Sequence, residues 1–303
     1  MTDMPCKVHR GAHRPVRRGF LPQPLWLPSD LICSPTVPGR VSVICPAHNA
    51  ERFLPEAIRS CLWQEPHPPD EIVLVDDGST DETWDVIRDL RRGRPEIVAV
   101  RQNQLGPSAA RNRAIRLASG EFVIYLDADD LMPPDRIALT LAEFAATGAD
   151  FIYGQKEVFE RDWRKRTGRD WATTPDARNI VGGTGCGTNS VAVRRHLHVD
   201  RGVWLDETMS GAEDAELLIA CLGAGASLHC SKAVLVWRRS HAESLRHFVD
   251  WRQMRRYIVA KHREWLEAYT GKRMGMGEDE ARDIWQARAA AGVIAVRSTG
   301  EIA

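Results

Sequence analysis

Several patterns that would identify a function directly are missing from this chain of 303 residues. Its seven cysteines form no Cys-x-x-Cys pair and several lie in apolar runs, so we expect reduced core thiols of a cytosolic protein, without disulfides or zinc. No apolar run is long enough to span a membrane, and the N-terminus lacks the apolar centre of a signal peptide. The 41 basic and 41 acidic residues give zero net charge, which argues against a nucleic-acid-binding protein.

Glycine-rich phosphate-binding loops are also missing. The first strand-like run, residues 40–45, is followed by Pro-Ala-His-Asn at 46–49 and not by the Gly-x-Gly-x-x-Gly of a dinucleotide-binding domain. A Walker A sequence is absent as well. A bound nucleotide would therefore have to be held by carboxylates and a metal ion.

Strand-like and helix-like stretches alternate over the first half of the chain. Buried strands are expected at 40–45, 71–75, 97–100 and 122–126, and helices at 50–63 and 79–91 and after residue 108. Ser79 with Glu82 has the spacing of a capping box, and Ser108 can cap the third helix. This alternation predicts an α/β fold with a Rossmann-like, doubly wound, mainly parallel sheet and helices on both faces.

Acidic residues directly follow two of these strands. Asp76 and Asp77 end the second strand, and Asp127 and Asp129 follow the fourth. Parallel strands end at one edge of a sheet, where ligands of such folds bind. In an extended chain the outer acids of Asp-x-Asp point the same way and can share a hard cation that carries a diphosphate. The alternative is a solvated turn, because aspartate is common in turns.

Five segments, taken in order, resemble family 2 glycosyltransferases, which have the GT-A fold. They are residues 46–49, 76–81, 106–112, 127–129, and the late acidic segment formed by 205–207 and 211–217. The resemblance covers about residues 41–244. It implies an inverting, metal-dependent enzyme that moves a sugar from a nucleotide-diphosphate sugar, with UDP favoured, to an acceptor hydroxyl. The acceptor would belong to a polysaccharide, a lipid-linked glycan or another glycoconjugate.

The resemblance also implies a set of donor and metal contacts. The donor nucleotide would contact Pro46, Asn49, Asp76, Asp77, Arg111 and Asp127. Asp129 would bind Mn²⁺ or Mg²⁺, with His241 as a second ligand or a phosphate contact. Arg238 and Arg239 would add charge-assisted contacts to the diphosphate.

The late acidic segment is matched to the catalytic base. Asp214 corresponds to the carboxylate proposed to take the proton of the acceptor hydroxyl, and Glu213 would orient it or contact substrate. An inverting displacement needs such a base, because the attacking hydroxyl loses its proton as it bonds to the anomeric carbon. The alternative is two ordinary acids in a first helical turn, where they offset the helix dipole.

Three regions follow from these patterns. Residues 1–39 are expected to be a basic, proline-rich, flexible arm, and residues 40–245 a GT-A domain whose nucleotide half ends near 130 and whose acceptor half is 131–245. Residues 246–303 are expected to be a helical extension with Trp251, Met254 and Ile258 at helical spacing. Its apolar face would pack on the domain or on a second subunit, or rest on an anionic membrane surface near a lipid-linked acceptor.

Two other functions share part of this pattern. A non-catalytic nucleotide-sugar-binding protein would be expected to have lost an acid, yet Asp77, Asp127, Asp129 and Asp214 are all present. A nucleotidyltransferase would bring a glycine-rich, basic loop after the first strand, where this chain has residues 46–49.

Overall fold

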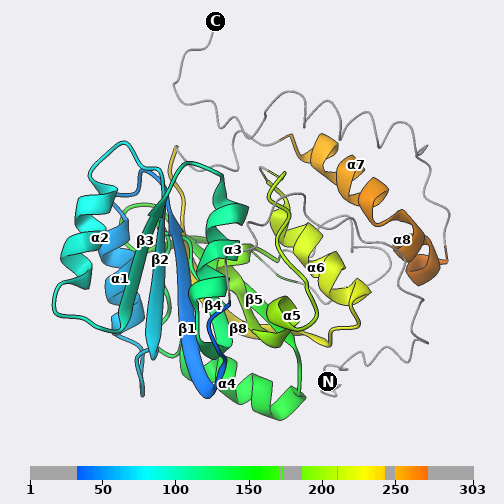
Figure 1. The fold of residues 1–303 in the computed structure, drawn as a ribbon, viewed down its shortest axis with the longest axis horizontal. Helices are drawn as coiled ribbons and strands as arrows, with labels where there is room; N and C mark the ends of the chain where they lie inside the picture. The colour runs from blue at the N-terminus through cyan, green and yellow to red at the C-terminus, as the bar shows by residue number, and fades with distance from the viewer. Residues whose placement is uncertain (1–32, 171, 173–185, 210, 243–249, 272–303) are drawn as a thin grey trace, which may run out of the picture.

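The computed structural model describes residues 33–170, 172, 186–209, 211–242 and 250–271 (Figure 1). The elements are β1 (Val37–Ala47), α1 (Leu54–Leu62), β2 (Glu71–Asp77), α2 (Thr83–Arg91), β3 (Ile97–Gln102), α3 (Pro107–Leu117), β4 (Gly120–Tyr125), α4 (Arg136–Thr147), β5 (Phe151–Phe159), β6 (Arg166–Asp170), the 3-10 turn η1 (Thr188–Ser190), β7 (Val191–Arg194), α5 (His196–Val199), α6 (Glu213–Gly223), β8 (Leu228–Arg239), α7 (Trp251–Lys261) and α8 (Arg263–Thr270). The expected arm up to residue 32 and the end of the extension lie outside the described residues.

One sheet organises the molecule, with strand order β3-β2-β1-β4-β7-β5-β6 and β8 paired to β5. The β1–β2, β2–β3, β1–β4 and β5–β8 pairs are parallel, while β7 runs antiparallel to β4 and β5. The expected doubly wound, mainly parallel α/β sheet is therefore confirmed. Its first strand begins at Val37, three residues before the apolar run that indicated it.

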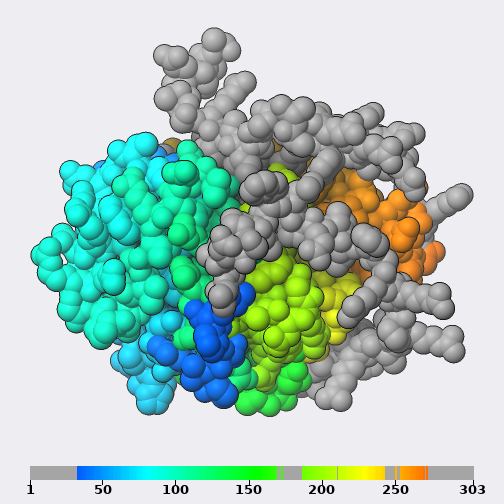
Figure 2. Space-filling model, viewed as in Figure 1, coloured from blue at the N-terminus to red at the C-terminus, as the bar shows by residue number. Residues whose placement is uncertain are grey.

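Helices cover both faces of this sheet (Figure 1). Successive residues of β1 point to opposite faces, so Ile44 lies in the core under α3 and α6, whereas Val43 and Cys45 lie in the core under α1 and α4. Both faces of the central strands are thus sealed from water. Figure 2 shows the cyan segment that carries α1, β2, α2 and β3 and the orange helices α7 and α8 at opposite ends of this view, with the segment that carries α5 and α6 between them.

The helices begin later or earlier than the sequence signals predicted. The first expected helix starts at Leu54 instead of residue 50. α2 starts at Thr83, so the predicted capping box is wrong: the Ser79 hydroxyl instead accepts a hydrogen bond of 3.0 Å from the backbone N–H of Asn49. α3 starts at Pro107, which lacks an N–H and suits a first turn, so Ser108 lies inside the helix and does not cap it.

The sequence pattern does not predict all the strands and helices that follow β4. The apolar run at 149–154 is shorter than the strand that forms there: β5 extends to Phe159 and pairs with β6. α4 was not anticipated; its buried Ile137 and Phe144 pack on the sheet face opposite α3. Trp163, in the connection between β5 and β6, stacks on Trp237 of β8 with ring centroids 4.9 Å apart.

The two C-terminal helices pack on α6. Met254 and Ile258 of α7 and Leu266 of α8 are buried against Met209 and Ile219. The apolar side of α7 is therefore used inside the chain, as one of the sequence-based accounts expected. Among the described residues, no helix has the length and apolarity needed to cross a membrane.

Candidate active site

The acidic strand ends meet at one edge of the sheet, as expected from their place in the sequence. β1 lies between β2 and β4, with Ala47 opposite Asp76 and Ile44 opposite Tyr125. Half-buried Pro46 is the next-to-last residue of β1. The segments after β1, β2 and β4 therefore start side by side.

Asp77 fixes the loop that leads into α3. Its Oδ1 accepts hydrogen bonds from Gln102 Nε2 at 2.7 Å and from the Leu105 N–H at 2.9 Å, and its Oδ2 accepts one from the Gly106 N–H at 2.8 Å. Gly106 adopts a φ of 97°, a conformation that favours glycine. The carboxylate is buried and already has three donors. Its expected contact with the base or ribose stays a prediction.

Asp76 and Asn49 hold the neighbouring turn. Asp76 is fully buried, accepts the Ser79 N–H at 3.1 Å and pairs with Arg101 Nε at 2.9 Å, so it fixes its own loop, and its expected contact with the donor nucleotide stays a prediction. Asn49 has a left-handed backbone with φ 49° and is exposed; its Oδ1 accepts the Thr80 N–H at 2.8 Å. These bonds tie the end of β1 to the end of β2.

The acids after β4 form a candidate metal site. One carboxylate oxygen from each of Asp127, Asp129 and Asp130 lies within 4.8 Å of the others. The Nε2 atom of His241 is 2.8 Å from Asp129 Oδ2, so the structure brings together the two residues expected to bind metal. The Nδ1 atom of His241 is buried and has no hydrogen-bond partner among the described residues.

The electrostatics of this cluster suit a cation. Desolvation raises the pKa of Asp127 although its side chain is 28% exposed; Arg111 opposes the rise, and the Asp129 charge adds to it. Burial, reinforced by the charges of Asp129 and Asp127, raises the pKa of Asp130 well above its ordinary value. A divalent ion would offset both effects, and carboxylate oxygens are the ligands that Mg²⁺ and Mn²⁺ prefer. The residues therefore fit the expected metal.

Asp130 serves as an anchor that sequence reasoning missed. Its Oδ2 accepts a hydrogen bond from Asn189 Nδ2 at 2.5 Å, and its Oδ1 accepts the Arg239 N–H at 2.7 Å. It is only 2% exposed. It thus joins the end of β4 to η1 and to the end of β8. The third acid after the strand was its only signal in the sequence.

Arg111 connects the acidic cluster with α6. This buried guanidinium contacts Asp127 Oδ1 at 2.6 Å and Glu213 Oε1 at 3.1 Å. Burial alone would lower the pKa of Arg111, but the two carboxylates raise it above its ordinary value. Three residues selected from separate motifs are therefore in direct contact.

Asp214 lies in the first turn of α6, next to Glu213. Burial raises its pKa to about 6, the Glu213 charge adds to the rise, and the Lys156 ammonium opposes it. Its Oδ1 accepts the Ala215 N–H at 2.8 Å. A carboxyl group with a pKa near 6 is a better proton acceptor than an ordinary aspartate and is still ionised at neutral pH.

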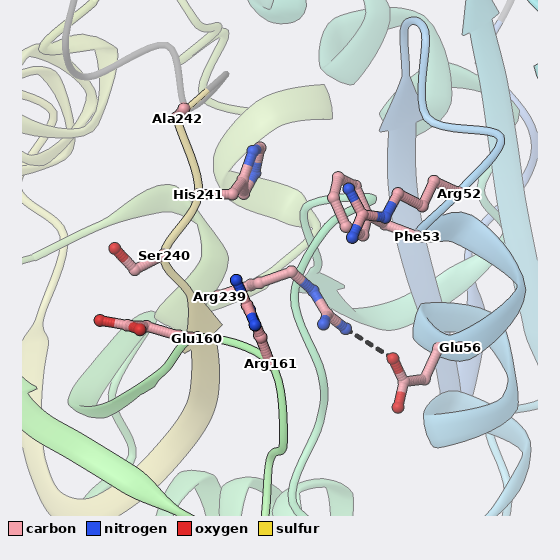
Figure 3. A pocket seen from close by; sticks show the side chains of 9 residues that line it. All are labelled: Arg52, Phe53, Glu56, Glu160, Arg161, Arg239, Ser240, His241 and Ala242. Atoms are coloured by element: carbon pink, nitrogen blue, oxygen red, sulfur yellow. Dashed lines mark hydrogen bonds and ion pairs between the residues drawn. The ribbon is translucent and has the colours of Figure 1, made fainter.

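Arg239 and His241 line a pocket of about 660 Å³ beside the cluster (Figure 3). The Arg239 guanidinium pairs with Glu56 Oε2 at 2.6 Å and donates to the Asp129 carbonyl at 2.9 Å. It therefore also positions the acidic cluster, and its expected contact with a diphosphate stays a prediction. Arg238 is half-buried in β8 and is not among the lining residues.

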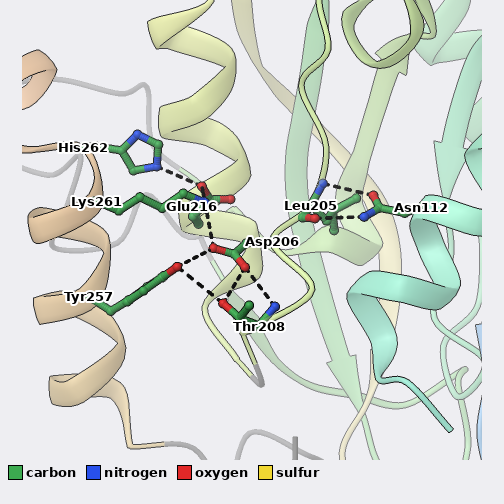
Figure 4. Close-up of polar contacts among 8 residues, drawn as sticks. All are labelled: Asn112, Leu205, Asp206, Thr208, Glu216, Tyr257, Lys261 and His262. Atoms are coloured by element: carbon green, nitrogen blue, oxygen red, sulfur yellow. Dashed lines mark hydrogen bonds and ion pairs between the residues drawn. The ribbon is translucent and has the colours of Figure 1, made fainter. Parts of the chain in front are cut away.

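A buried polar network between α6 and the C-terminal helices was also missed (Figure 4). The Lys261 ammonium lies 2.7 Å from Asp206 Oδ2 and 2.6 Å from Glu216 Oε1. Tyr257 donates to Asp206 Oδ2 at 2.7 Å, and His262 Nε2 is 2.9 Å from Glu216 Oε1. No local pattern in the sequence marks Lys261 as a buried partner of these acids.

The same network reaches the helix that carries Arg111. Asn112 donates from Nδ2 to the Leu205 carbonyl at 2.9 Å and to Glu207 Oε1 at 2.8 Å, and its Oδ1 accepts the Leu205 N–H at 3.0 Å. Asp206 stands between these two residues in the chain. The network thus fixes α3 and α6 relative to each other, and with them Arg111 and Glu213.

The sequence model of glycosyl transferase family 2 matches residues 42–197, and the chain belongs to this family. Among curated relatives, the putative teichuronic acid biosynthesis glycosyltransferase TuaG of Bacillus subtilis is 37% identical over 124 residues, which are 40% of this chain and 48% of that protein. The chondroitin synthase of Escherichia coli is 34% identical over 104 residues, 34% of this chain and 15% of that protein. The matches thus span less than half of either relative.

Solved structures share the fold. Staphylococcus aureus TarS in complex with UDP-GlcNAc superposes with a TM-score of 0.59 at 20% identity, over 86% of this chain and 74% of that one. The mannosyltransferase PcManGT of Pyrobaculum calidifontis, in complex with GDP-Man and Mn²⁺, gives a TM-score of 0.55 at 20% identity, over 88% and 79%. Both likenesses confirm the GT-A architecture.

Proposed function

We propose that the protein is an inverting glycosyltransferase that moves a sugar from a nucleotide-diphosphate sugar, with UDP favoured, to an acceptor hydroxyl. The observation that carries the proposal is the contact of Arg111 with both Asp127 and Glu213. Asp127 belongs to the candidate metal site, and Glu213 directly precedes the candidate base Asp214 in the first turn of α6. The neighbouring structures with UDP-GlcNAc and with GDP-Man and Mn²⁺ support a nucleotide-sugar donor.

In this proposal each group has a separate task. Asp129, with Asp127 and His241, would hold Mn²⁺ or Mg²⁺, which when bound neutralises the charge that grows on a leaving diphosphate. Asp214 would accept the proton of the acceptor hydroxyl at a carboxylate oxygen. Arg111 would hold the Asp127 and Glu213 carboxylates in place through its two ion pairs.

The acceptor is proposed only by class, as a hydroxyl group of a polysaccharide, lipid-linked glycan or other glycoconjugate. We also propose that residues 40–245 form the glycosyltransferase domain and that residues 246–303 support it from the C-terminal side. Packing of Met254 and Ile258 on α6 supports this role for α7.

A transfer assay tests the proposal. The protein would be incubated with Mn²⁺ and individual UDP-, GDP- and dTDP-sugars, and release of the nucleoside diphosphate would be followed with and without acceptors. We expect slow hydrolysis of one donor, loss of release in EDTA, and loss in Asp214→Asn with donor binding retained. Donor binding without any release by the wild-type protein, with or without acceptor sugars, would favour a non-catalytic nucleotide-sugar-binding protein.

A further inference from the structure

Two buried polar side chains converge beside Gly187, and neither has yet been assigned a contact with substrate. Lys156 of β5 is 8% exposed and Asn189 of η1 is 6% exposed. A Cβ atom on Gly187 would lie 2.7 Å from Lys156 Nζ and 2.8 Å from Asn189 Oδ1. Both polar atoms therefore lie next to the Gly187 backbone, in space that the side chain of any other residue would occupy.

The Asn189 amide is oriented by the acidic cluster. Its Nδ2 donates to Asp130 Oδ2 at 2.5 Å, which leaves Oδ1 on the other side of the amide. This Oδ1 is buried and has no hydrogen-bond partner among the described residues. Buried carbonyl oxygens almost always have a partner, so an unpaired one beside a site indicates a missing donor.

The pair is linked to both the candidate metal cluster and the candidate base. Asn189 contacts Asp130, the neighbour of the candidate metal ligand Asp129. Lys156 is close enough to Asp214 for its charge to act on that carboxylate. The anomeric carbon must lie between the diphosphate and the base, so the transferred sugar would pass this pair.

The chemistry of the pair matches a hydroxyl group. An ammonium only donates hydrogen bonds and an amide oxygen only accepts them, whereas a hydroxyl does both. We propose that Lys156 and Asn189 bind a hydroxyl of the transferred sugar and thereby select the donor. This inference rests on the proposed function.

Two variants test the pair without replacing any residue of the acidic cluster. Gly187 has a φ of −131°, which alanine adopts freely, so Gly187→Ala only places a methyl group against the two polar atoms. Lys156→Met removes the ammonium and keeps most of the side chain. Gly168→Ala in β6 is the matched control, because a Cβ there meets only Val158 at 3.9 Å.

The measurement is calorimetric binding in the presence of Mn²⁺. It compares the free nucleotides UDP and GDP with the nucleotide sugars UDP-glucose, UDP-GlcNAc, UDP-galactose and GDP-mannose. We expect both variants to bind the free nucleotide as the wild type does, which also shows that they are folded. Each should lose affinity for the preferred nucleotide sugar by about 10- to 100-fold, the range for a hydrogen bond to a charged group. Gly168→Ala should change neither.

Three results would overturn the inference. Equal losses for nucleotide and nucleotide sugar would mean that the pair only supports the fold, and unchanged binding of both would mean that it contacts no sugar. A raised KM for the acceptor with unchanged donor binding would assign the hydroxyl to the acceptor. If the folded wild-type protein binds no nucleotide or nucleotide sugar at all, the proposed function fails as well.

Discussion

Lys261 is the single ammonium between two carboxylates that would otherwise repel each other, and its replacement by methionine tests the network that fixes α6. Glu216 is 1% exposed and the Asp206 side chain 8% exposed, so both charges depend on this partner. Removing one partner of a buried ion pair costs about 3–5 kcal/mol. Tyr257 and His262 still contact the two acids, so we expect Lys261→Met to lower the free energy of unfolding by about 3 kcal/mol, at the low end of that range.

Urea unfolding followed by circular dichroism measures this loss. With an m-value of about 3 kcal/mol/M, the midpoint should fall by about 1 M. Lys232→Met, at an exposed lysine of β8, is the control and should leave the midpoint nearly unchanged. Adding Glu216→Gln to Lys261→Met should restore part of the loss, because it removes one uncompensated charge. An unchanged midpoint in Lys261→Met would refute the account of this network.

The same ion pair predicts how stability depends on pH. Burial alone would raise the pKa of Asp206, but Lys261 and the hydroxyls of Thr208 and Tyr257 lower it to about 2. Because the pKa is lower in the folded state, this contribution is present above the unfolded pKa of about 4 and is lost as the pH falls from about 4 to about 2. The acid dependence should be smaller in Lys261→Met, as measured by urea unfolding at several pH values.

Three further outcomes are expected. Hydrolysis of the preferred donor should rise with pH through about 6, where Asp214 loses its proton, and Asp214→Asn should lower the rate by about 10²- to 10⁴-fold and abolish this rise; an unaltered profile would place the base elsewhere. Arg111→Met leaves Asp127 and Glu213 without their shared cation and should cost about 3–5 kcal/mol in urea unfolding without added metal, whereas a neutral effect would contradict the bridging role. The protein should not bind anionic vesicles through α7, because the apolar side chains of Met254 and Ile258 are packed on α6. Co-sedimentation with vesicles measures this. Sedimentation of the wild type that is lost in Met254→Ser would contradict the packing account, whereas sedimentation kept in that variant would show that other residues make the contact.

The fold could be predicted because its central strands are apolar on both faces. Runs such as 71–75 have the composition of strands sealed between helices, and the acids that follow them mark the ligand-binding edge. Arg111, Asp127 and Glu213 could be selected as site residues for a different reason, because each belongs to a motif of the resembled family. Their roles toward a donor or an acceptor stay predictions.

The remaining contacts could not be predicted, because they join residues far apart in the chain. Asp130 meets Asn189 and Arg239, and Lys261 meets Asp206 and Glu216, without any local pattern that would pair them. Side chains that look like surface charges in the sequence become buried once β8 and α7 pack on the domain. The start of α3 was predicted wrongly for a local reason, because the helix begins at Pro107 and not after a Ser108 cap.

The most direct test of the central claim is a calorimetric titration of the protein with UDP, GDP and dTDP, each in Mn²⁺ and in EDTA, alongside Asp129→Ala. We expect one nucleotide to bind in Mn²⁺ and to lose that affinity both in EDTA and in Asp129→Ala, with circular dichroism showing that the variant is folded. Absence of binding by the folded wild-type protein would contradict a nucleotide-sugar-dependent enzyme. Equal binding in Mn²⁺ and EDTA would contradict the metal site at Asp129.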